Sequence, residues 1–410
     1  MENTSRNCYY FATNLVAGLS IFILNVRFSA AYVSYFWIIS FLYLIYCVWH
    51  GRISRNAIVR ICRTDWTDLK ILIAGIFIFY GLLLVSGLLL GDKSSMKTAV
   101  EWFLYVCPLF VFLFLSSSNN INKGIAVGMF LAIIANAVLG GLQLGGIVTE
   151  NLRDPNGVRI QGFFGHPNSL GSVLAWTIPF VGYFLYKSKT MPQKMFTLFI
   201  LMLSLLCLFL TNSRGAAVSL ITGLAGTALI YALVHRNQLG IRQKLAVVFL
   251  CLALAVGTGA ALNSSVHNTR DLGERQLMWS SSMQMWEDHK LLGVGIGRWP
   301  ENYYSERYHP AEGHEMGHYF PHNMPIYFLS GAGILGGIGY LCLVLSMLYV
   351  LLKRAIESDG ITSAIPMMAV FIAFIMDGMI DATLTNKTVG IPFYALLGYA
   401  IGTFHTGREH

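Results

Sequence analysis

Charged residues are scarce in this 410-residue chain: they make up 12% of it, whereas apolar residues make up 55% and the mean hydropathy is +0.59. Soluble domains carry about twice that charged fraction, so a soluble protein of two or three domains is excluded. The alternation of apolar and polar residues that marks a membrane β-barrel is also missing. These absences leave a polytopic α-helical membrane protein.

Three further patterns are missing. The net charge of +8 is spread over many loops, which argues against a nucleic-acid-binding face. The seven cysteines lie in apolar runs or in segments assigned to the cytoplasmic side, so no disulfide framework is expected. The N-terminal residues include one basic residue, Arg6, and no small-residue cleavage site, so we expect the first apolar run to be retained as a span.

Apolar runs of roughly the length of a membrane crossing recur along the chain. We predict about twelve transmembrane helices in a single domain, 1–410, because no internal repeat or low-complexity tract divides the sequence. The runs lie near 11–26, 31–49, 71–90, 97–116, 124–147, 168–186, 195–210, 216–234, 245–262, 326–352, 362–380 and 390–404.

Lys and Arg set the predicted orientation, because they are enriched in cytoplasmic loops. They are more frequent in the loop 50–70 and its alternates than in the opposite loops, and an even number of spans puts both termini on that cytoplasmic side. The large polar block 263–325, between the ninth and tenth spans, then faces outward, into a periplasm if the cell has two membranes. This block, which we call the cap, holds six of the eleven histidines, so we expect the chemistry there.

Two arginines are candidates for binding an anion. Arg214 lies in a very short outward turn between two apolar runs; it either snorkels into the headgroup region or binds a lipid-linked phosphate through its bidentate donors. Arg275 opens a predicted helix from Gly273 to about Lys290, whose apolar stripe is more typical of packing than of binding. Two guanidiniums near one anion would suit a diphosphate leaving group.

His322, at the end of the cap, either accepts a proton from a sugar hydroxyl or caps the next helix. With His314 and His318 it forms an i, i+4, i+8 series that raises the question of zinc. Two glycines and a proline interrupt that series and no cysteine contributes, so we predict no metal and no cofactor.

Other outward residues are predicted to bind substrate. Arg298 follows a glycine-rich stretch that lacks the preceding strand of a dinucleotide loop and is better explained as a tight turn. His166 stands at the mouth of the sixth span. Ionisable residues at membrane depth are functional candidates, although Asp381, near the outward end of the eleventh span, can also serve only to orient a neighbour. The predicted substrate-binding set is Arg214, Arg275, His166, Asn323, His318, Asp381 and Arg298.

The order and spacing of several short motifs resemble the O-antigen ligase and polymerase superfamily. These are Gly162-Phe163-Phe164-Gly165-His166-Pro167-Asn168, Asn212-Ser213-Arg214-Gly215, Gly293-Val294-Gly295-Ile296-Gly297, and His322-Asn323 followed by Gly331-Ala332-Gly333-Ile334-Leu335-Gly336. The motif-bearing part runs from roughly 160 to 390, and the N-terminal third resembles the family only in its apolar spans. Met324 departs from the pattern, since some members carry a carboxylate there; another residue must then assist His322 if that assistance is needed.

The resemblance implies a GT-C-like, inverting, metal-independent glycosyltransferase at the periplasmic face of the bacterial inner membrane. The donor would be an O-antigen glycan on undecaprenyl diphosphate, and for a ligase of lipopolysaccharide biosynthesis the acceptor would be the lipid A core. By position, Arg214 and Arg275 match the diphosphate-contacting arginines, and His322 matches the general base or acceptor-orienting histidine. Asp381 matches an acidic residue in the penultimate span.

Three alternatives remain open from the sequence. A polymerase of O-antigen or exopolysaccharide would have the same spans but an undecaprenyl-linked acceptor. A protein-glycosylating relative is disfavoured by the absence of an appended C-terminal domain. A transporter would place ionisable groups near mid-membrane and show paired, interrupted helices, whereas the charges here gather at the outer edge.

Overall fold

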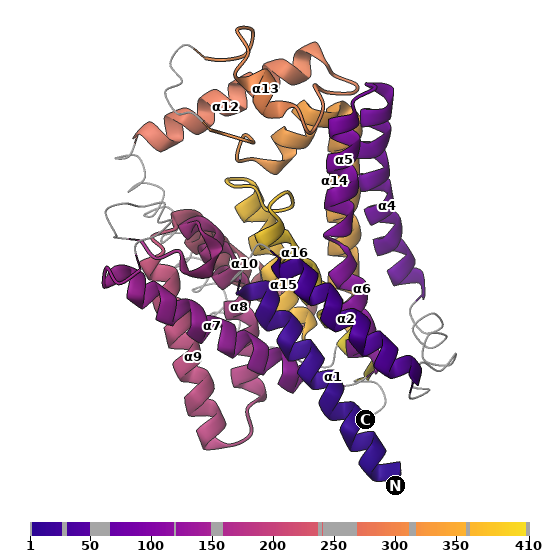
Figure 1. Ribbon diagram of the computed structural model, residues 1–410, viewed down its shortest axis with the longest axis vertical. Helices are drawn as coiled ribbons and strands as arrows, with labels where there is room; N and C mark the ends of the chain where they lie inside the picture. Colours follow the sequence, from indigo (N-terminus) through magenta and orange to yellow (C-terminus); the bar gives the residue numbers. More distant parts are fainter. Residues whose placement is uncertain are drawn as a thin grey trace.

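The computed structural model describes residues 2–26, 31–49, 66–118, 120–148, 159–236, 240, 269–310, 317–357 and 361–406. Within these ranges the regular structure is helical and includes no strand. The helices are α1 (Glu2–Asn25), α2 (Tyr32–Trp49), α4 (Trp66–Leu89), α5 (Lys93–Leu104), α6 (Cys107–Ser118), α7 (Asn122–Leu144), the 3₁₀ turn η1 (Gly162–Phe164), α8 (Pro167–Lys187), α9 (Met191–Leu210), α10 (Arg214–Val234), α12 (Thr269–Asp288), α13 (Trp299–Tyr303), α14 (Met324–Glu357), α15 (Ala364–Gly378) and α16 (Lys387–Thr406), arranged as in Figure 1.

The predicted all-helical membrane architecture is confirmed. Within the described ranges, nine helical stretches are long and apolar enough to cross a membrane, with α5 and α6 counted as one stretch. The shorter apolar helix α15 and the helix α16 occupy the last two predicted runs. The predicted run 245–262 lies outside the described residues.

Small residues allow the membrane helices to approach closely. Where α1 crosses α7, a Cβ on Gly128 would overlap the carbonyl of Gly18. Where α16 packs on α6, a Cβ on Gly398 would overlap the carbonyl of Leu109. Association in lipid depends on such close packing, because water supplies no hydrophobic driving force there.

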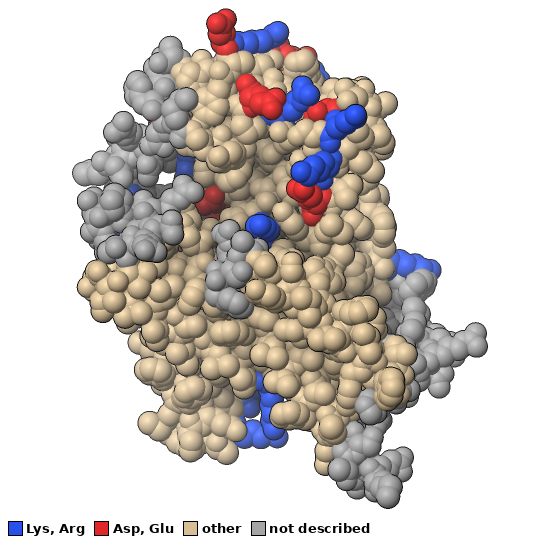
Figure 2. Space-filling view, in the orientation of Figure 1, with Lys and Arg blue, Asp and Glu red and all other residues tan. Residues whose placement is uncertain are grey.

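The cap lies at one end of the molecule. Figure 1 shows α12 and α13 above the start of α14 and beside the α4–α5 turn, while α1 begins and α16 ends toward the opposite end. On the face drawn in Figure 2, charged side chains gather mostly over the cap end and at the opposite end, with a largely uncharged band between them. This distribution is the one expected of a bundle whose middle is surrounded by lipid.

The helices of the cap are held to each other and to the bundle. The indole N–H of Trp299, the first residue of α13, donates to Ser282 Oγ on α12 at 2.9 Å. The α12 helix itself packs along α14. The predicted helix from Gly273 to about Lys290 is therefore confirmed, and it begins four residues earlier, at Thr269.

Candidate active site

His322 occupies the turn immediately before α14, with a left-handed backbone φ of 52°. Such a conformation is unfavourable for a residue with a Cβ and persists only where the surroundings hold it. Asn323 holds it on one side: its amide donates to the Met379 carbonyl at 3.0 Å and its amide oxygen accepts from the Ile326 N–H at 3.1 Å. Asn323, predicted to bind substrate, is thus a buried helix cap that ties α14 to the end of α15.

The imidazole of His322 is paired with Asp381. Its Nδ1 lies 3.0 Å from Asp381 Oδ1, and each side chain is 24% exposed. Asp381 lies in the connection between α15 and α16, where the same Oδ1 accepts from the Ala382 N–H at 2.7 Å. A carboxylate only accepts, so Nδ1 carries a proton, and in the neutral form of the imidazole Nε2 is the acceptor nitrogen. This is the arrangement that a general base requires.

The carboxyl group of Asp381 is ionised at neutral pH. Burial alone would raise its pKa, but the hydrogen bond and charge of His322, the Ala382 N–H and the charge of Arg275 together lower the pKa to about 2. An ordinary aspartate titrates near pH 3.9. The pair therefore contributes its full stabilisation above about pH 4 and loses it as the pH falls through about 2.

The Asp381→Asn variant should lower kcat by at least roughly 10-fold and by up to about 10⁴-fold, the loss seen when a carboxylate that orients a catalytic imidazole becomes an amide. An amide can donate to Nδ1 and so favours the tautomer whose Nε2 already carries a proton. Steady-state kinetics of the purified variant would measure this loss. Asp288→Asn, which removes a cap carboxylate bound to Arg307 at 2.7 Å, is the matched control. Equal kcat for the Asp381 variant and the wild type would contradict the assignment.

Arg275 approaches this pair from α12. One turn after it, the indole N–H of Trp279 donates to the Pro321 carbonyl at 2.8 Å, which fixes α12 against the residue that precedes His322. Arg275 is close enough for its charge to lower the pKa of Asp381. Its side chain is half-buried, and within the described residues no ion pair engages its guanidinium.

Arg214 is the first residue of α10, after the helix cap Ser213. A Cβ on Gly215 would come within 2.8 Å of Ile380 Cδ1 and 3.9 Å of Asp377 Oδ1, so the start of α10 abuts the segment that leads to Asp381. The Arg214 side chain is exposed, and no ion pair or side-chain hydrogen bond holds it in the part of the chain that the structure describes. The structure thus brings the helix ends that carry Arg214 and Arg275 to the His322–Asp381 pair.

His166 and the start of α8 lie in the same neighbourhood. His166 caps α8, since its Nδ1 accepts from the Asn168 N–H at 3.2 Å, and α8 begins one residue before the predicted run 168–186. Arg159 joins this end to the turn before Arg214 by donating to Asn168 Oδ1 at 2.7 Å and to the carbonyl of Thr211 at 2.8 Å. On the other side, Asn386 donates to Ser169 Oγ at 3.3 Å, which ties α8 to the connection that carries Asp381.

His318 lies beside His322 with the two rings edge to face, their centroids 6.0 Å apart. Its backbone N–H donates to the hydroxyl of Tyr304 at 2.7 Å. His314, the other member of the suggested zinc series, lies outside the described residues. Among those described, no group of three or more His, Cys, Asp or Glu side chains is placed to hold a metal ion.

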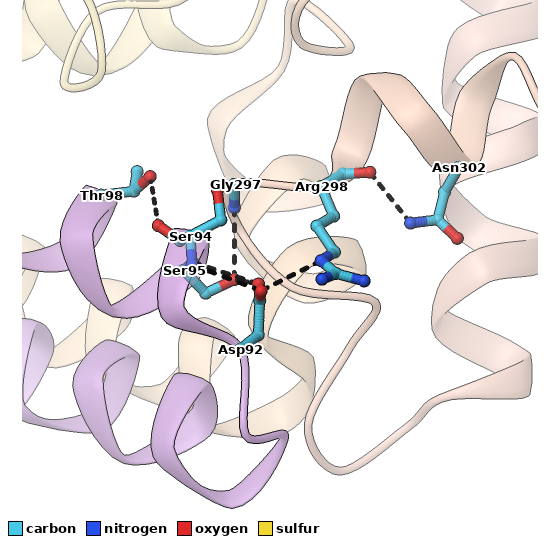
Figure 3. A network of polar contacts seen from close by, with 7 residues as sticks. All are labelled: Asp92, Ser94, Ser95, Thr98, Gly297, Arg298 and Asn302. Atoms are coloured by element: carbon cyan, nitrogen blue, oxygen red, sulfur yellow. Dashed lines mark hydrogen bonds and ion pairs between the residues drawn. The ribbon is translucent and has the colours of Figure 1, made fainter.

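Arg298 belongs to a different set of contacts. Its Nε donates to Asp92 Oδ1 at 3.0 Å, and Asp92 in turn accepts from Ser95, whose hydroxyl lies near the Gly297 N–H (Figure 3). Asp92 is 7% exposed and caps α5, so this pair anchors the start of α13 to the α4–α5 turn. Within the described residues, no hydrogen bond or ion pair links Arg298 to His322 or Asp381.

Arg298→Ala and Asp92→Ala should therefore both lower the thermal stability of the purified protein. Arg298→Ala loses the half-exposed ion pair, which should lower the free energy of unfolding by about 0–1 kcal/mol. Asp92→Ala loses the same ion pair and also the buried cap of α5, which should lower it by about 1 kcal/mol more than Arg298→Ala does. A double-mutant cycle on the melting temperature would show coupling between them. A raised KM for the donor in Arg298→Ala, with unchanged melting temperature, would instead support the predicted role of Arg298 in substrate binding.

Sequence reasoning named Asp381 among the substrate-binding candidates but did not identify it as the partner of His322. The two residues are 59 positions apart, so no local pattern joins them. The one sequence feature that points to a distant carboxylate partner is Met324, because some members of the resembling family carry a carboxylate at that position beside the histidine. Trp279 belongs to the apolar stripe of the helix that carries Arg275, and no sequence pattern predicts its hydrogen bond to Pro321.

Comparison with known families supports the resemblance. Residues 199–341 match the family model described as O-antigen ligase. Arg214, Arg275 and His322 all fall inside the matched region, whereas His166 and Asp381 lie outside it. No curated protein matches the sequence. The chain is thus a multi-pass membrane protein that is similar, over residues 199–341, to the O-antigen ligase family.

Proposed function

We propose that this protein is an O-antigen ligase: an inverting glycosyltransferase that moves O-antigen polysaccharide from undecaprenyl diphosphate to the lipid A core. The observation that carries the proposal is the His322–Asp381 pair, held at 3.0 Å beside the two helix ends that carry Arg214 and Arg275. A base whose Nδ1 is bound to a carboxylate, and two guanidiniums that form no ion pair within the described ranges, are what the transfer of a sugar from a diphosphate needs.

In the proposed reaction, a hydroxyl of the acceptor attacks the anomeric carbon of the donor on the face opposite the diphosphate. His322 Nε2 takes the hydroxyl proton as the new C–O bond forms. The bond from the anomeric carbon to the diphosphate oxygen breaks at the same time, so the configuration inverts and undecaprenyl diphosphate leaves with the bonding electrons. Asp381 stabilises the imidazolium that forms, and the arginines offset the charge that grows on the leaving oxygen.

In this proposal the arginines, rather than a metal ion, neutralise the diphosphate. Arginine suits this task because its planar guanidinium offers paired donors to phosphate oxygens and stays charged at any accessible pH. The site would work at the periplasmic face of the inner membrane, where both lipid-linked substrates reside. The proposal draws this orientation from the distribution of Lys and Arg over the loops.

The test is reconstitution of the purified protein in liposomes with undecaprenyl-diphosphate-linked glycan and lipid A core, in the presence of chelator. Glycan attached to the core in the wild type, and lost in His322→Ala, would support the ligase and the metal-free mechanism. Longer glycan chains that remain on undecaprenyl diphosphate would identify a polymerase instead. Neither product from folded protein with matched substrates would contradict the transferase proposal and favour a transporter.

A further inference from the structure

The helix α14 is broken at Gly333, whose φ of 63° and ψ of −154° are not helical. In an unbroken helix the carbonyl of Ser330 would accept from the N–H of Ile334. Here the Ser330 carbonyl accepts from the Val294 N–H at 2.9 Å, and the Ile334 N–H donates to the carbonyl of Lys290 at 2.8 Å. The cap segment after α12 thus satisfies the backbone groups that the break in α14 exposes.

Both glycine motifs of the sequence meet at this contact. Gly295 donates its N–H to the carbonyl of Gly331 at 2.8 Å. Gly293 has a φ of 66°, and a Cβ there would lie only 2.5 Å from the carbonyl oxygen of Ser330. A Cβ on Gly333 would overlap the backbone of Leu291. The two motifs are therefore the two sides of one backbone-to-backbone contact, which leaves no room for side chains.

Two side-chain hydrogen bonds reinforce this contact. The buried hydroxyl of Tyr327, on the first segment of α14, donates to the carbonyl of Ile296 at 2.6 Å. Ser86 on α4 donates from its hydroxyl to the carbonyl of Leu292 at 2.7 Å. We call the segment 290–297, with the broken helix it contacts, the clasp.

The clasp joins the two elements that carry the candidate catalytic groups. On one side, α12 carries Arg275 and ends at Asp288, two residues before the clasp begins. On the other side, the first segment of α14 begins at Met324, two residues after His322. The hydrogen bond from Trp279 to Pro321 joins the same two elements a second time, at the end nearest the site. With bonds at both ends, α12 cannot slide along α14 without breaking one of them.

We propose that Trp279 and Tyr327 are positioning residues, which through the bonds at the two ends of this contact fix the Arg275 helix relative to His322. The proposal rests on the proposed transferase function. Neither residue needs to touch substrate: Trp279 acts through the Pro321 carbonyl and Tyr327 through the Ile296 carbonyl. The left-handed backbone of His322 then has a constraint on each side, from Pro321 before it and from Asn323 after it.

The expected consequence is a loss of rate rather than of affinity. A base and a leaving-group cation contribute to the transition state only when both are held within a fraction of an ångström of the productive geometry. Trp279→Phe and Tyr327→Phe keep the ring and remove one donor each. We expect each substitution to lower kcat by about tenfold and to leave KM for the donor within about twofold.

Matched controls are available on the same helices. Trp286→Phe makes the same change on α12, where the indole N–H is buried and makes no hydrogen bond among the described residues. Tyr340→Phe makes the same change on α14 at a largely buried ring that contacts Phe328. Both controls should retain wild-type kcat.

A measurement that does not depend on activity separates this proposal from the proposed function. Spin labels at the exposed positions Gln276 and Tyr319, in a full-length chain without other reactive cysteines, report the distance between α12 and the segment before His322. We expect a narrow distance distribution in the wild type and in Trp286→Phe, and a broader one in Trp279→Phe. An unchanged distribution in Trp279→Phe, or a broadened one with wild-type kcat, would overturn the positioning role. Absence of product from the wild type would count against the proposed function alone.

Discussion

Replacement of His322 by alanine is expected to lower kcat by roughly 10²- to 10⁴-fold, the range that a positioned general base contributes. The sugar hydroxyl is a weak nucleophile, and without Nε2 its proton must go to water. The variant also loses the hydrogen bond and charge that lower the pKa of Asp381, so burial should raise the pKa of that carboxyl group once the ring is gone. KM for the donor should change little, since the arginines remain.

The measurement is single-turnover transfer by reconstituted, folded protein, with His289→Ala as the control. His289 is an exposed histidine of the cap that follows the last residue of α12, at the end of the helix away from Arg275. His322→Gln separates proton removal from orientation of the acceptor, because glutamine keeps a hydrogen-bonding group but does not accept a proton. If His322 only orients the acceptor, the glutamine variant should recover most of the activity. Activity within a few fold of wild type in the alanine variant would exclude both roles.

The membrane architecture could be predicted from the sequence because hydropathy reports burial in lipid directly. The run predicted at 195–210 is α9, and the run at 216–234 lies within α10. Backbone breaks carry no such signal. The run at 326–352 reads as one continuous apolar span, although α14 is broken inside it at Gly333. The glycines there were visible, but a close backbone contact and ordinary helix packing require the same residue type.

The candidate site could be predicted one residue at a time but not as a set of contacts. Outward histidines and arginines stand out against an apolar chain, and His322, Arg214 and Arg275 were named for that reason. Their roles stay predictions. The contact of Arg298 with Asp92 spans 206 positions, and nothing near Arg298 distinguishes a substrate-binding arginine from one that anchors a helix. Only the folded chain decides which carboxylate lies beside which cation.

Replacement of Arg214 or Arg275 by alanine should lower kcat by roughly 10²- to 10³-fold each, the scale of one lost transition-state contact to developing charge. The two losses should not add fully in the double variant if both guanidiniums act on the same diphosphate. Lysine should restore little, because a point charge does not reproduce paired donors. Arg307→Ala, which removes a well-exposed arginine of the cap, is the control.

Inhibition by inorganic pyrophosphate tests whether the two arginines bind the diphosphate of the donor or the headgroups of membrane lipids. Pyrophosphate carries the leaving group's anionic part without its lipid, so it should compete with the donor in the wild type. Its inhibition constant should rise in Arg214→Ala and Arg275→Ala and stay unchanged in His322→Ala, because in the proposed reaction the histidine contacts the acceptor rather than the diphosphate. If Arg214 instead snorkels and binds only headgroups, Arg214→Ala should leave the inhibition constant of pyrophosphate unchanged and weaken the association of the protein with anionic lipid. Measured as displacement of bound donor by pyrophosphate, this constant requires no turnover by the variants, and it decides between the two roles that the sequence left open for Arg214.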